Sequence, residues 1–290
     1  MPDVPQITRF APSPTGLLHL GHAYAAIAAH DAADKCQFLL RIEDLDKGRS
    51  RPEHIQGIFE DLDWLGLKWK KPVICQSTRT DAYRSALAKL ERSDLIYPCF
   101  CTRREIAAEI ARAGEAPHTS DSDTIIYPGT CRSLSHAHRE RRLADGQRYA
   151  IRLDSVKAAA QCPKLSFEEL GIGPRGERGD IDVDPLLFGD IVLARKDLPA
   201  AYHLAVVVDD AFQEVTLVTR GNDLFTATHV QRLLQTLLAL PSPRYAHHRL
   251  IRDQTGKRLS KRDQAATLRS LHSEGVSPGQ IRERLGLKSS

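Results

Sequence analysis

Residues 9–22 read RFAPSPTGLLHLGH, and the pattern around them indicates the class of fold. A short strand pattern (QITRFA, 6–11) leads into a proline-rich turn at 12–16, and an alanine-rich helical pattern begins at Gly21. The apolar run QFLLRI at 37–42 then predicts a buried strand. Strand, turn, helix and strand in this order predict a parallel βαβ unit, and therefore an α/β fold.

The rest of the chain alternates between helical and strand-like segments. Apolar spacing predicts helices at 53–65, 80–92 and 225–240, and one or two short helices within 264–287. Strand-like runs lie at 149–153, 188–194, 203–208 and 214–218. Polar stretches predict loops at 112–124, 171–180 and 253–263.

The bulk composition is that of an ordinary globular protein. Of 290 residues, 41% are hydrophobic and 27% are charged. A formal net charge of +4 permits an RNA partner without requiring one. No apolar run approaches the roughly 18 residues of a membrane span, and the N-terminus lacks a signal-peptide pattern. The composition therefore speaks against a membrane protein, and we expect a cytoplasmic one.

The HLGH segment lies where the first predicted strand ends and the first predicted helix begins. Such a junction forms the ligand crevice of open α/β sheets, and a helix N-terminus attracts phosphate groups. Gly16 and Gly21 let the backbone approach a phosphate closely, while His19 and His22 share one side of the first helical turn. The segment favours nucleotide chemistry, although HxGH also occurs in small nucleotidyltransferases and two surface histidines give the same letters.

A second signature, GKRLSKR, occupies residues 256–262. A loop with four cations can close over a triphosphate and stabilise the charge that develops on phosphoryl oxygens and on leaving pyrophosphate. Ser260 can donate a further hydrogen bond. Alone, such a cluster reads equally well as a solvated basic loop, but its place at the end of an α/β domain that begins with HLGH favours the nucleotide role.

Together the two segments resemble the signatures of class I aminoacyl-tRNA synthetases, since HLGH is similar to HIGH and RLSKR to KMSKS. The segments RFAPSPTG, RIEDLD (41–46), YHLAVVVDD (202–210) and TRGNDL (219–224) narrow the resemblance to the glutamyl-tRNA synthetase group. The resemblance implies a Rossmann-like catalytic domain that uses ATP, with Mg²⁺ beside it. It implies catalytic roles for His19, His22 and Lys261. It implies ATP binding by His19, Gly21, His22, Arg258, Leu259, Ser260 and Lys261.

A glutamate substrate has two carboxylates and one ammonium, so its site needs cations, an anion and neutral donors. Arg9 and Arg220 can supply forked donors, Glu43 can accept the ammonium, and Tyr202 can donate to a carboxylate. Each of them, read singly, would also suit a surface ion pair or a rim position. The resemblance implies an amino-acid pocket formed by Arg9, Phe10, Ala11, Pro12, Ser13, Glu43, Tyr202 and Arg220. His203 stands where we expect asparagine in relatives, which leaves its role open.

Three of the six cysteines, Cys99, Cys101 and Cys131, are grouped within residues 96–148, which we predict to be an insertion in the α/β domain. Clustered cysteines in a reducing compartment favour a metal over disulfides, and three thiolates with one further ligand suit tetrahedral Zn²⁺. The resemblance implies one structural zinc ion held by Cys99, Cys101, Tyr127 and Cys131. Because a phenolate is an unusual zinc ligand, His118, His136 and His138 are rivals for the fourth position. Three reduced cysteines without a metal are the alternative.

The predicted division of the chain is two halves of a catalytic domain at 1–95 and 149–245, an insertion at 96–148, and the KMSKS-like loop with short helices at 246–290. Only 28 residues follow Arg262, too few for the helical anticodon-reading domains of a full glutamyl-tRNA synthetase. This layout resembles the glutamyl-queuosine tRNA(Asp) synthetases.

That resemblance implies an RNA acceptor in the anticodon loop of tRNA(Asp), where glutamate is joined to queuosine and not to a tRNA 3′ end. An exposed loop nucleoside is a suitable target, because single-stranded loops present their bases for recognition. The alternatives are a catalytic fragment of a glutamyl-tRNA synthetase and an inactive RNA-binding paralogue. We expect a monomer without a membrane partner.

Overall fold

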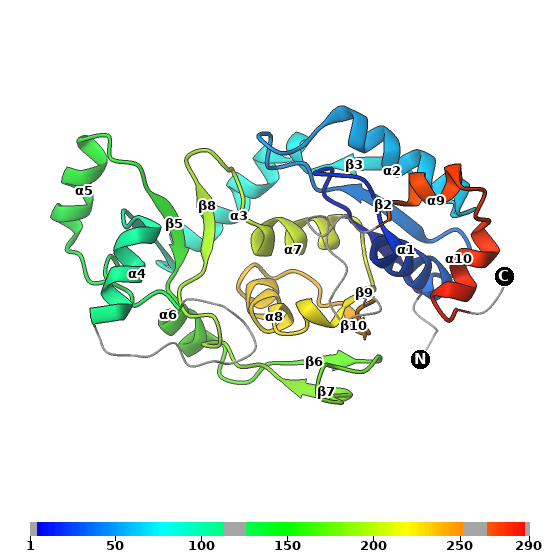
Figure 1. Ribbon diagram of the computed structural model, residues 1–290. Helices are drawn as coiled ribbons and strands as arrows, with labels where there is room; N and C mark the ends of the chain where they lie inside the picture. The colour runs from blue at the N-terminus through cyan, green and yellow to red at the C-terminus, as the bar shows by residue number, and fades with distance from the viewer. Residues whose placement is uncertain (1–4, 113–125, 252–265, 288–290) are drawn as a thin grey trace.

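A computed structural model describes residues 5–112, 126–251 and 266–287 of the chain. Its first sheet confirms the predicted βαβ unit and extends it by one more crossover (Figure 1). The strands are parallel and their order is β1-β2-β3. In chain order, the elements are β1 (Thr8–Phe10), α1 (Leu20–Ala32), β2 (Phe38–Ile42), α2 (Pro52–Trp64) and β3 (Lys70–Cys75).

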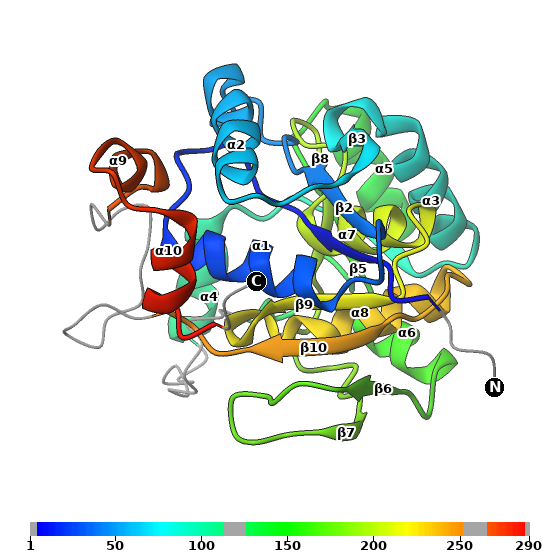
Figure 2. The same cartoon turned by 90° about the vertical axis from the view of Figure 1, so that its right-hand side faces the viewer.

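A second sheet joins the first through its strand β9. The carbonyl of Ile7, just before β1, accepts hydrogen bonds from the backbone N–H groups of Thr216 and Leu217 at 3.0 and 3.1 Å. The sheet has the order β7-β6-β10-β9, and Figure 2 shows β9 and β10 running beneath α1. Its elements are β6 (Ser166–Glu169), β7 (Gly179–Asp182), β9 (Leu217–Gly221), the short helix η2 (Asn222–Leu224), α8 (Ala227–Leu237) and β10 (Arg244–His248). Because β1 and β9 are neighbours from which the chain departs in opposite directions, a ligand crevice is expected at their carboxyl ends.

A third, antiparallel sheet lies at the far side of the molecule, with the order β4-β5-β8. The chain between β4 and β5 carries α4 and α5, which Figure 1 shows at the end opposite α1 and α10. The elements of this region are η1 (Gln76–Thr78), α3 (Thr80–Arg92), β4 (Ile96–Cys99), α4 (Arg103–Arg112), α5 (His136–Ala144), β5 (Ala150–Leu153), α6 (Ser155–Gln161) and β8 (Val192–Arg195). The division of the chain into separate domains stays a prediction.

The predicted strand at 203–208 is wrong, because these residues lie inside helix α7 (Tyr202–Phe212). A short apolar run cannot be assigned to a strand or a buried helix from its periodicity alone. Here Leu204, Ala205, Val206 and Val207 are all buried in one core with residues of α8. Tertiary packing around the helix therefore accounts for an apolar run that imitates a buried strand.

The C-terminal segment forms the two short helices α9 (Leu268–Ser273) and α10 (Pro278–Arg284), as predicted. Their apolar residues enter the same core as α1 and α2, with Leu271 and Ile281 packed in the cluster that contains Ile27 and Ile58. A capping box at Ser277 begins α10. Among the described helices, none is both long enough and apolar enough to cross a membrane.

Candidate active site

One cavity gathers the predicted nucleotide and amino-acid residues that the structure describes. It has a volume of about 460 Å³ and lies at the carboxyl ends of β1, β2 and β9. Its lining includes Arg9, Phe10, Ala11, Pro12, Ser13, His19, Gly21, His22, Glu43, Tyr202 and Arg220. The other predicted ATP-binding residues, Arg258, Leu259, Ser260 and Lys261, lie outside the described residues. A cavity of this size is typical of small-molecule sites.

The two histidines of HLGH form the first turn of α1. His19 is the N-cap, and its Nδ1 accepts a hydrogen bond from the backbone N–H of Gly21 at 3.1 Å. Nδ1 of His22 accepts from the backbone N–H of His19 at 3.2 Å, and the two ring centroids are 3.9 Å apart. Because each Nδ1 is an acceptor, each neutral ring carries its proton on Nε2 and can donate there. A Cβ at Gly21 would lie only 2.9 Å from Cε1 of His19, so the imidazole ring can pack against the first turn of the helix because residue 21 is a glycine.

A buried group of charges supports the end of β1. Nε of Arg9 donates to Oδ1 of Asp210 at 3.0 Å, and Nη1 of Arg41 donates to the same oxygen at 2.7 Å. Nη2 of Arg41 lies 3.4 Å from Oε1 of Glu43. Burial alone would raise the pKa of Asp210, but the two guanidinium groups outweigh burial and hold the pKa of that carboxyl below its ordinary value. Asp210 therefore remains an anion that orients both arginines.

Glu43 lies at the edge of this charge cluster and faces the cavity. Its side chain is 16% exposed, and burial raises the pKa of its carboxyl, while Arg41 and Arg9 oppose that rise. An ammonium group placed in the cavity would favour the ionised carboxylate. Glu43 is thus suited to bind a cationic part of a ligand.

Arg220, at the end of β9, is held by three buried side chains. Its Nε donates to Nε2 of His247 at 3.0 Å, its Nη1 to Oε1 of Gln231 at 2.7 Å, and its Nη2 to Oγ1 of Thr228 at 2.6 Å. The residue is 5% exposed, yet it lines the cavity. Each terminal nitrogen carries a second N–H, so the guanidinium can still bind an anion while its plane is fixed.

His247 links this arginine to a buried carboxylate. Because its Nε2 accepts from Arg220, its proton lies on Nδ1, which donates to Oε2 of Glu169 at 2.5 Å. Both side chains are fully buried, and burial lowers the pKa of His247, which favours the neutral ring. Oε1 of Glu169 accepts from the backbone N–H groups of His247 and Gly171, both at 2.8 Å. A Cβ at Gly171 would lie 2.3 Å from the carbonyl oxygen of His247, so a glycine is required beside this pair.

Helix α7 begins with Tyr202 and His203, and the first of them reaches the cavity. Tyr202 is 36% exposed and lines the cavity. The ring of His203 lies 5.3 Å from that of Tyr202, and among the described residues its Nδ1 has no hydrogen-bond partner. Burial, and then the charge of Arg220, lower the pKa of His203 to about 4, so the ring is neutral near pH 7.

Sequence reasoning missed several residues of this site. The cavity is also lined by Tyr24, Asp223, His248 and Arg249. The supporting groups Arg41, Asp210, Glu169 and His247 were not predicted either. The two adjacent aspartates at the end of the apolar run of α7 could have indicated these supporting groups. A carboxylate buried with such a run must be paired with a buried cation.

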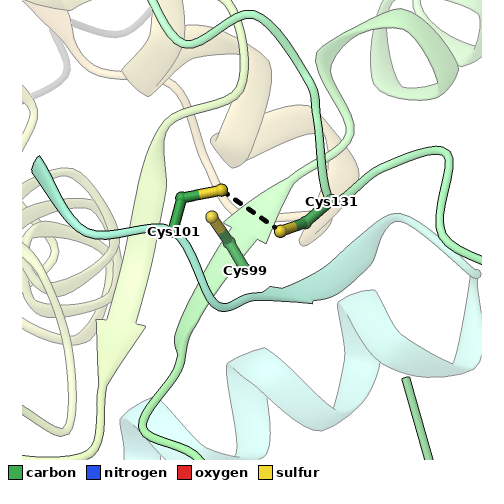
Figure 3. Close-up of side chains that lie close together, drawn as sticks. All are labelled: Cys99, Cys101 and Cys131. Carbon is green, nitrogen blue, oxygen red and sulfur yellow. Dashed lines mark hydrogen bonds between the residues drawn. The ribbon is translucent and has the colours of Figure 1, made fainter. Parts of the chain in front are cut away.

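The three grouped cysteines meet in the region between β4 and β5. Figure 3 shows their sulfur atoms turned toward one another, and all three lie within 4.8 Å of each other. Sγ of Cys101 is 3.4 Å from Sγ of Cys131 and 3.5 Å from the hydroxyl of Tyr127. A hydrogen bond from the Cys99 thiol lowers the pKa of Cys131 to about 6. This set of donors fits tetrahedral Zn²⁺, which prefers thiolates.

The rival histidines do not join the cysteines in the described part of the chain. His136 and His138 lie in α5 and are exposed, and His136 pairs with Glu140 at 3.6 Å. His118 is outside the described residues. Burial and hydrogen bonds to the cysteines raise the pKa of Tyr127, so its phenol is protonated in the metal-free arrangement. The ligand set stays a prediction.

The chain is similar to a known protein family and to individual synthetases. The chain matches the family of class I tRNA synthetases (E and Q), catalytic domain, over residues 6–288. It is 47% identical over 285 residues to the Glutamyl-Q tRNA(Asp) synthetase of Rhodobacter capsulatus, covering 97% of this chain and 100% of the relative. It is 43% identical over 282 residues to that of Nocardia farcinica, covering 97% and 83%.

A solved structure supports the fold. The glutamate–tRNA synthetase of Elizabethkingia anophelis is 28% identical, with a TM-score of 0.70 over 90% of this chain. This chain spans 53% of that synthetase, about half of its length. From the matches in sequence and structure, the chain belongs to the class I tRNA synthetases for glutamate and glutamine, is a ligase, and groups with the glutamyl-Q tRNA(Asp) synthetases.

Proposed function

We propose that this enzyme activates glutamate with ATP and transfers the glutamyl group to queuosine in the anticodon of tRNA(Asp). The observation that carries the proposal is the single cavity that brings the HLGH histidines together with Arg9, Glu43 and Arg220. The relatives from Rhodobacter capsulatus and Nocardia farcinica support the acceptor, because each is a Glutamyl-Q tRNA(Asp) synthetase that matches 97% of the chain.

In the activation step, a carboxylate oxygen of glutamate attacks the α-phosphorus of ATP, and pyrophosphate leaves. The carboxylate is already a nucleophile, so the site needs positioning and charge stabilisation and no general base. Nε2–H of His19 and of His22, with the N-terminus of α1, can bind phosphate oxygens. Lys261 of the KMSKS-like segment would stabilise the leaving pyrophosphate, and Mg²⁺ would accompany ATP.

Selection of glutamate follows from the charges of the cavity. Glu43 would bind the ammonium, because a cation beside this carboxyl favours its ionised form against the effect of burial. Arg220 would bind a carboxylate with the second N–H groups of Nη1 and Nη2, since its first ones are held by Gln231 and Thr228. Arg9 and Tyr202 complete the predicted set of donors.

In the transfer step, a hydroxyl of the queuosine ring attacks the carbonyl carbon of the glutamyl adenylate. An ester forms, AMP leaves, and the hydroxyl proton passes to the phosphate of AMP. The enzyme contributes by holding the adenylate and the nucleoside in contact. We also propose that the enzyme acts as a cytoplasmic monomer.

A structural zinc ion is part of the proposal. Cys99, Cys101 and Cys131 would hold it as thiolates, with the phenol oxygen of Tyr127 as fourth ligand. Zn²⁺ would stabilise the region between β4 and β5 without taking part in the reaction, because its donors line no part of the catalytic cavity.

Glutamate-dependent exchange of pyrophosphate into ATP tests the activation step. We expect exchange with glutamate and much slower exchange with aspartate or glutamine, because the cavity combines two arginines for carboxylates with one glutamate for the ammonium. Folded protein without exchange would support the inactive RNA-binding paralogue instead. Exchange followed by charging of tRNA(Glu) in place of tRNA(Asp) would support the fragment of a glutamyl-tRNA synthetase.

A further inference from the structure

Two hollows meet at the turn after β8, beside the active-site cavity. The first, of about 450 Å³, lies between the segment after β2, helix α3 and the turn after β8. The second, of about 390 Å³, lies between that same turn and the segments at Cys99–Thr102 and Arg148–Ala150. Both are lined by Arg195, Lys196 and Asp197, so the two hollows adjoin at the turn after β8. We call this surface the basic groove, after its lining residues Lys47, Arg84, Arg148, Tyr149, Arg195 and Lys196.

The charge of the basic groove is strongly positive. Its lining has five cationic side chains and one carboxylate, a net charge of +4, as large as the formal net charge of the whole chain. Arg195 forms an ion pair with Asp197 at 3.6 Å, and Arg84 forms one with Asp81 at 3.3 Å. In the described ranges, Lys47, Arg148 and Lys196 form no ion pair, and all three are exposed. Cations gathered without matching acids favour an anionic partner.

An exposed aromatic ring lies among these cations. Tyr149 is 37% exposed, and its ring centroid is 6.0 Å from that of Phe100. Such a ring offers a face on which an unpaired base can stack, while neighbouring arginines and lysines bind the phosphates. Free phosphate would use the cations alone. The combination therefore favours single-stranded nucleic acid over a small anion or an acidic peptide.

The basic groove begins next to the catalytic cavity. Lys47 follows the cavity residue Glu43 by four positions, and Pro199 of the groove precedes the cavity residue Tyr202 by three. Consecutive Cα atoms are about 3.8 Å apart, so these pairs lie at most about 15 and 11 Å apart along the chain. The groove and the cavity are thus close enough for one polynucleotide to contact both.

We propose that the basic groove binds the unpaired nucleotides that flank the nucleoside being modified. Arg195 and Lys196 contact their phosphates from the turn after β8, and Tyr149 stacks on one of their bases. This inference rests on the proposed function, since it gives the RNA of that reaction its surface. It adds the residues that hold the RNA outside the cavity.

Two double variants with the same change in charge test the inference. Arg195→Ala/Lys196→Ala changes the groove, and Lys68→Ala/Arg175→Ala removes two exposed cations that line neither the groove nor the cavity. Binding of queuosine-containing tRNA(Asp) is measured by fluorescence anisotropy between 50 and 200 mM salt. Loss of two phosphate contacts at 0.1 M salt should weaken binding by about 25- to 60-fold and flatten the salt slope by about 1.4–1.8. The control pair should bind within twofold of the unchanged protein.

Variants of Tyr149 test the stacking contact independently of the cations. Tyr149→Leu should weaken binding at every salt concentration without changing the slope, and Tyr149→Phe should keep the affinity. Glutamate-dependent pyrophosphate exchange, which needs no RNA, should stay within twofold in every variant and shows that each is folded. Equal weakening by both double variants, or no weakening by the groove variant, would overturn the inference. Absence of exchange in the unchanged protein would instead refute the proposed function.

Discussion

His247 provides a pair of variants that separates positioning from packing. Its Nε2 accepts from Arg220 and its Nδ1 donates to Glu169, with both side chains fully buried. The amide of asparagine overlies the position of Nδ1, and that of glutamine overlies Nε2. His247→Asn therefore keeps the contact to Glu169 and loses the one to Arg220, whereas His247→Gln does the reverse. Both replacement side chains are uncharged, and each variant loses one hydrogen bond to a charged group.

The size of the effect follows from that lost bond. A hydrogen bond to a charged partner contributes about 1.5–3 kcal/mol. Both variants should be destabilised by about that amount, which a protein of ordinary stability tolerates. Only His247→Asn releases Arg220, so it alone should raise KM for glutamate, by about 10- to 100-fold if most of the bond energy serves to orient the guanidinium. His247→Gln should raise KM for glutamate only a fewfold.

The assay is pyrophosphate exchange with glutamate varied at saturating ATP, and then with ATP varied at saturating glutamate. KM for ATP should be unchanged in both variants, because this histidine supports the amino-acid side of the cavity. Thermal denaturation checks that the two variants lose similar stability. Equal rises of KM for glutamate in both, or a parallel rise of KM for ATP, would refute a positioning role for His247.

Three further outcomes follow from the site. Asp210→Asn leaves Arg9 and Arg41 without their shared anion and should lower the free energy of unfolding at pH 7 by about 3–5 kcal/mol in urea titrations. The pKa of Asp210 in the folded protein is held below its ordinary value of 3.8, so the ionised carboxylate stabilises the fold above that pH. This stabilisation is lost as the pH falls through the pKa of the folded state, and the stability of the variant should therefore approach that of the unchanged protein in strong acid. A difference in stability that stays constant with pH would contradict this. Lys261→Ala should slow pyrophosphate exchange by about 10²–10³-fold without unfolding the protein. A near-normal rate would show that this segment is only a solvated basic loop. About one zinc ion per chain is expected by metal analysis, and Cys101→Ser should lower that content; unchanged zinc would place the metal elsewhere.

The local parts of the site could be predicted from the sequence. HLGH forms the N-cap and first turn of α1, as its place after the predicted turn implied, and glycine at position 21 fits the close approach of His19. The predicted βαβ order is confirmed because its signals are turns and short-range periodicity. In contrast, the apolar run of α7 was assigned to a strand, since its burial came from distant helices that no local pattern reveals.

The supporting parts could not be predicted, because they depend on long-range contacts. Arg41 and Asp210 are 169 positions apart, and Glu169 and His247 are 78 apart. Nothing in their spacing pairs them before the strands β2, β6 and β10 are ordered into sheets. The same holds for the basic groove, whose cations come from segments that meet only in the folded chain.

Transfer of labelled glutamate to tRNA(Asp) is the most direct test of the central claim. Three substrates are compared: tRNA(Asp) with queuosine, tRNA(Asp) without it, and queuosine-containing tRNA(Asp) whose 3′-terminal ribose alone has been oxidised. We predict transfer to the first and third, none to the second, and release of the label by mild alkali, as an ester requires. Loss of transfer when only the 3′ end is blocked, with the queuosine ring intact, would contradict the account and identify the 3′ end as the acceptor.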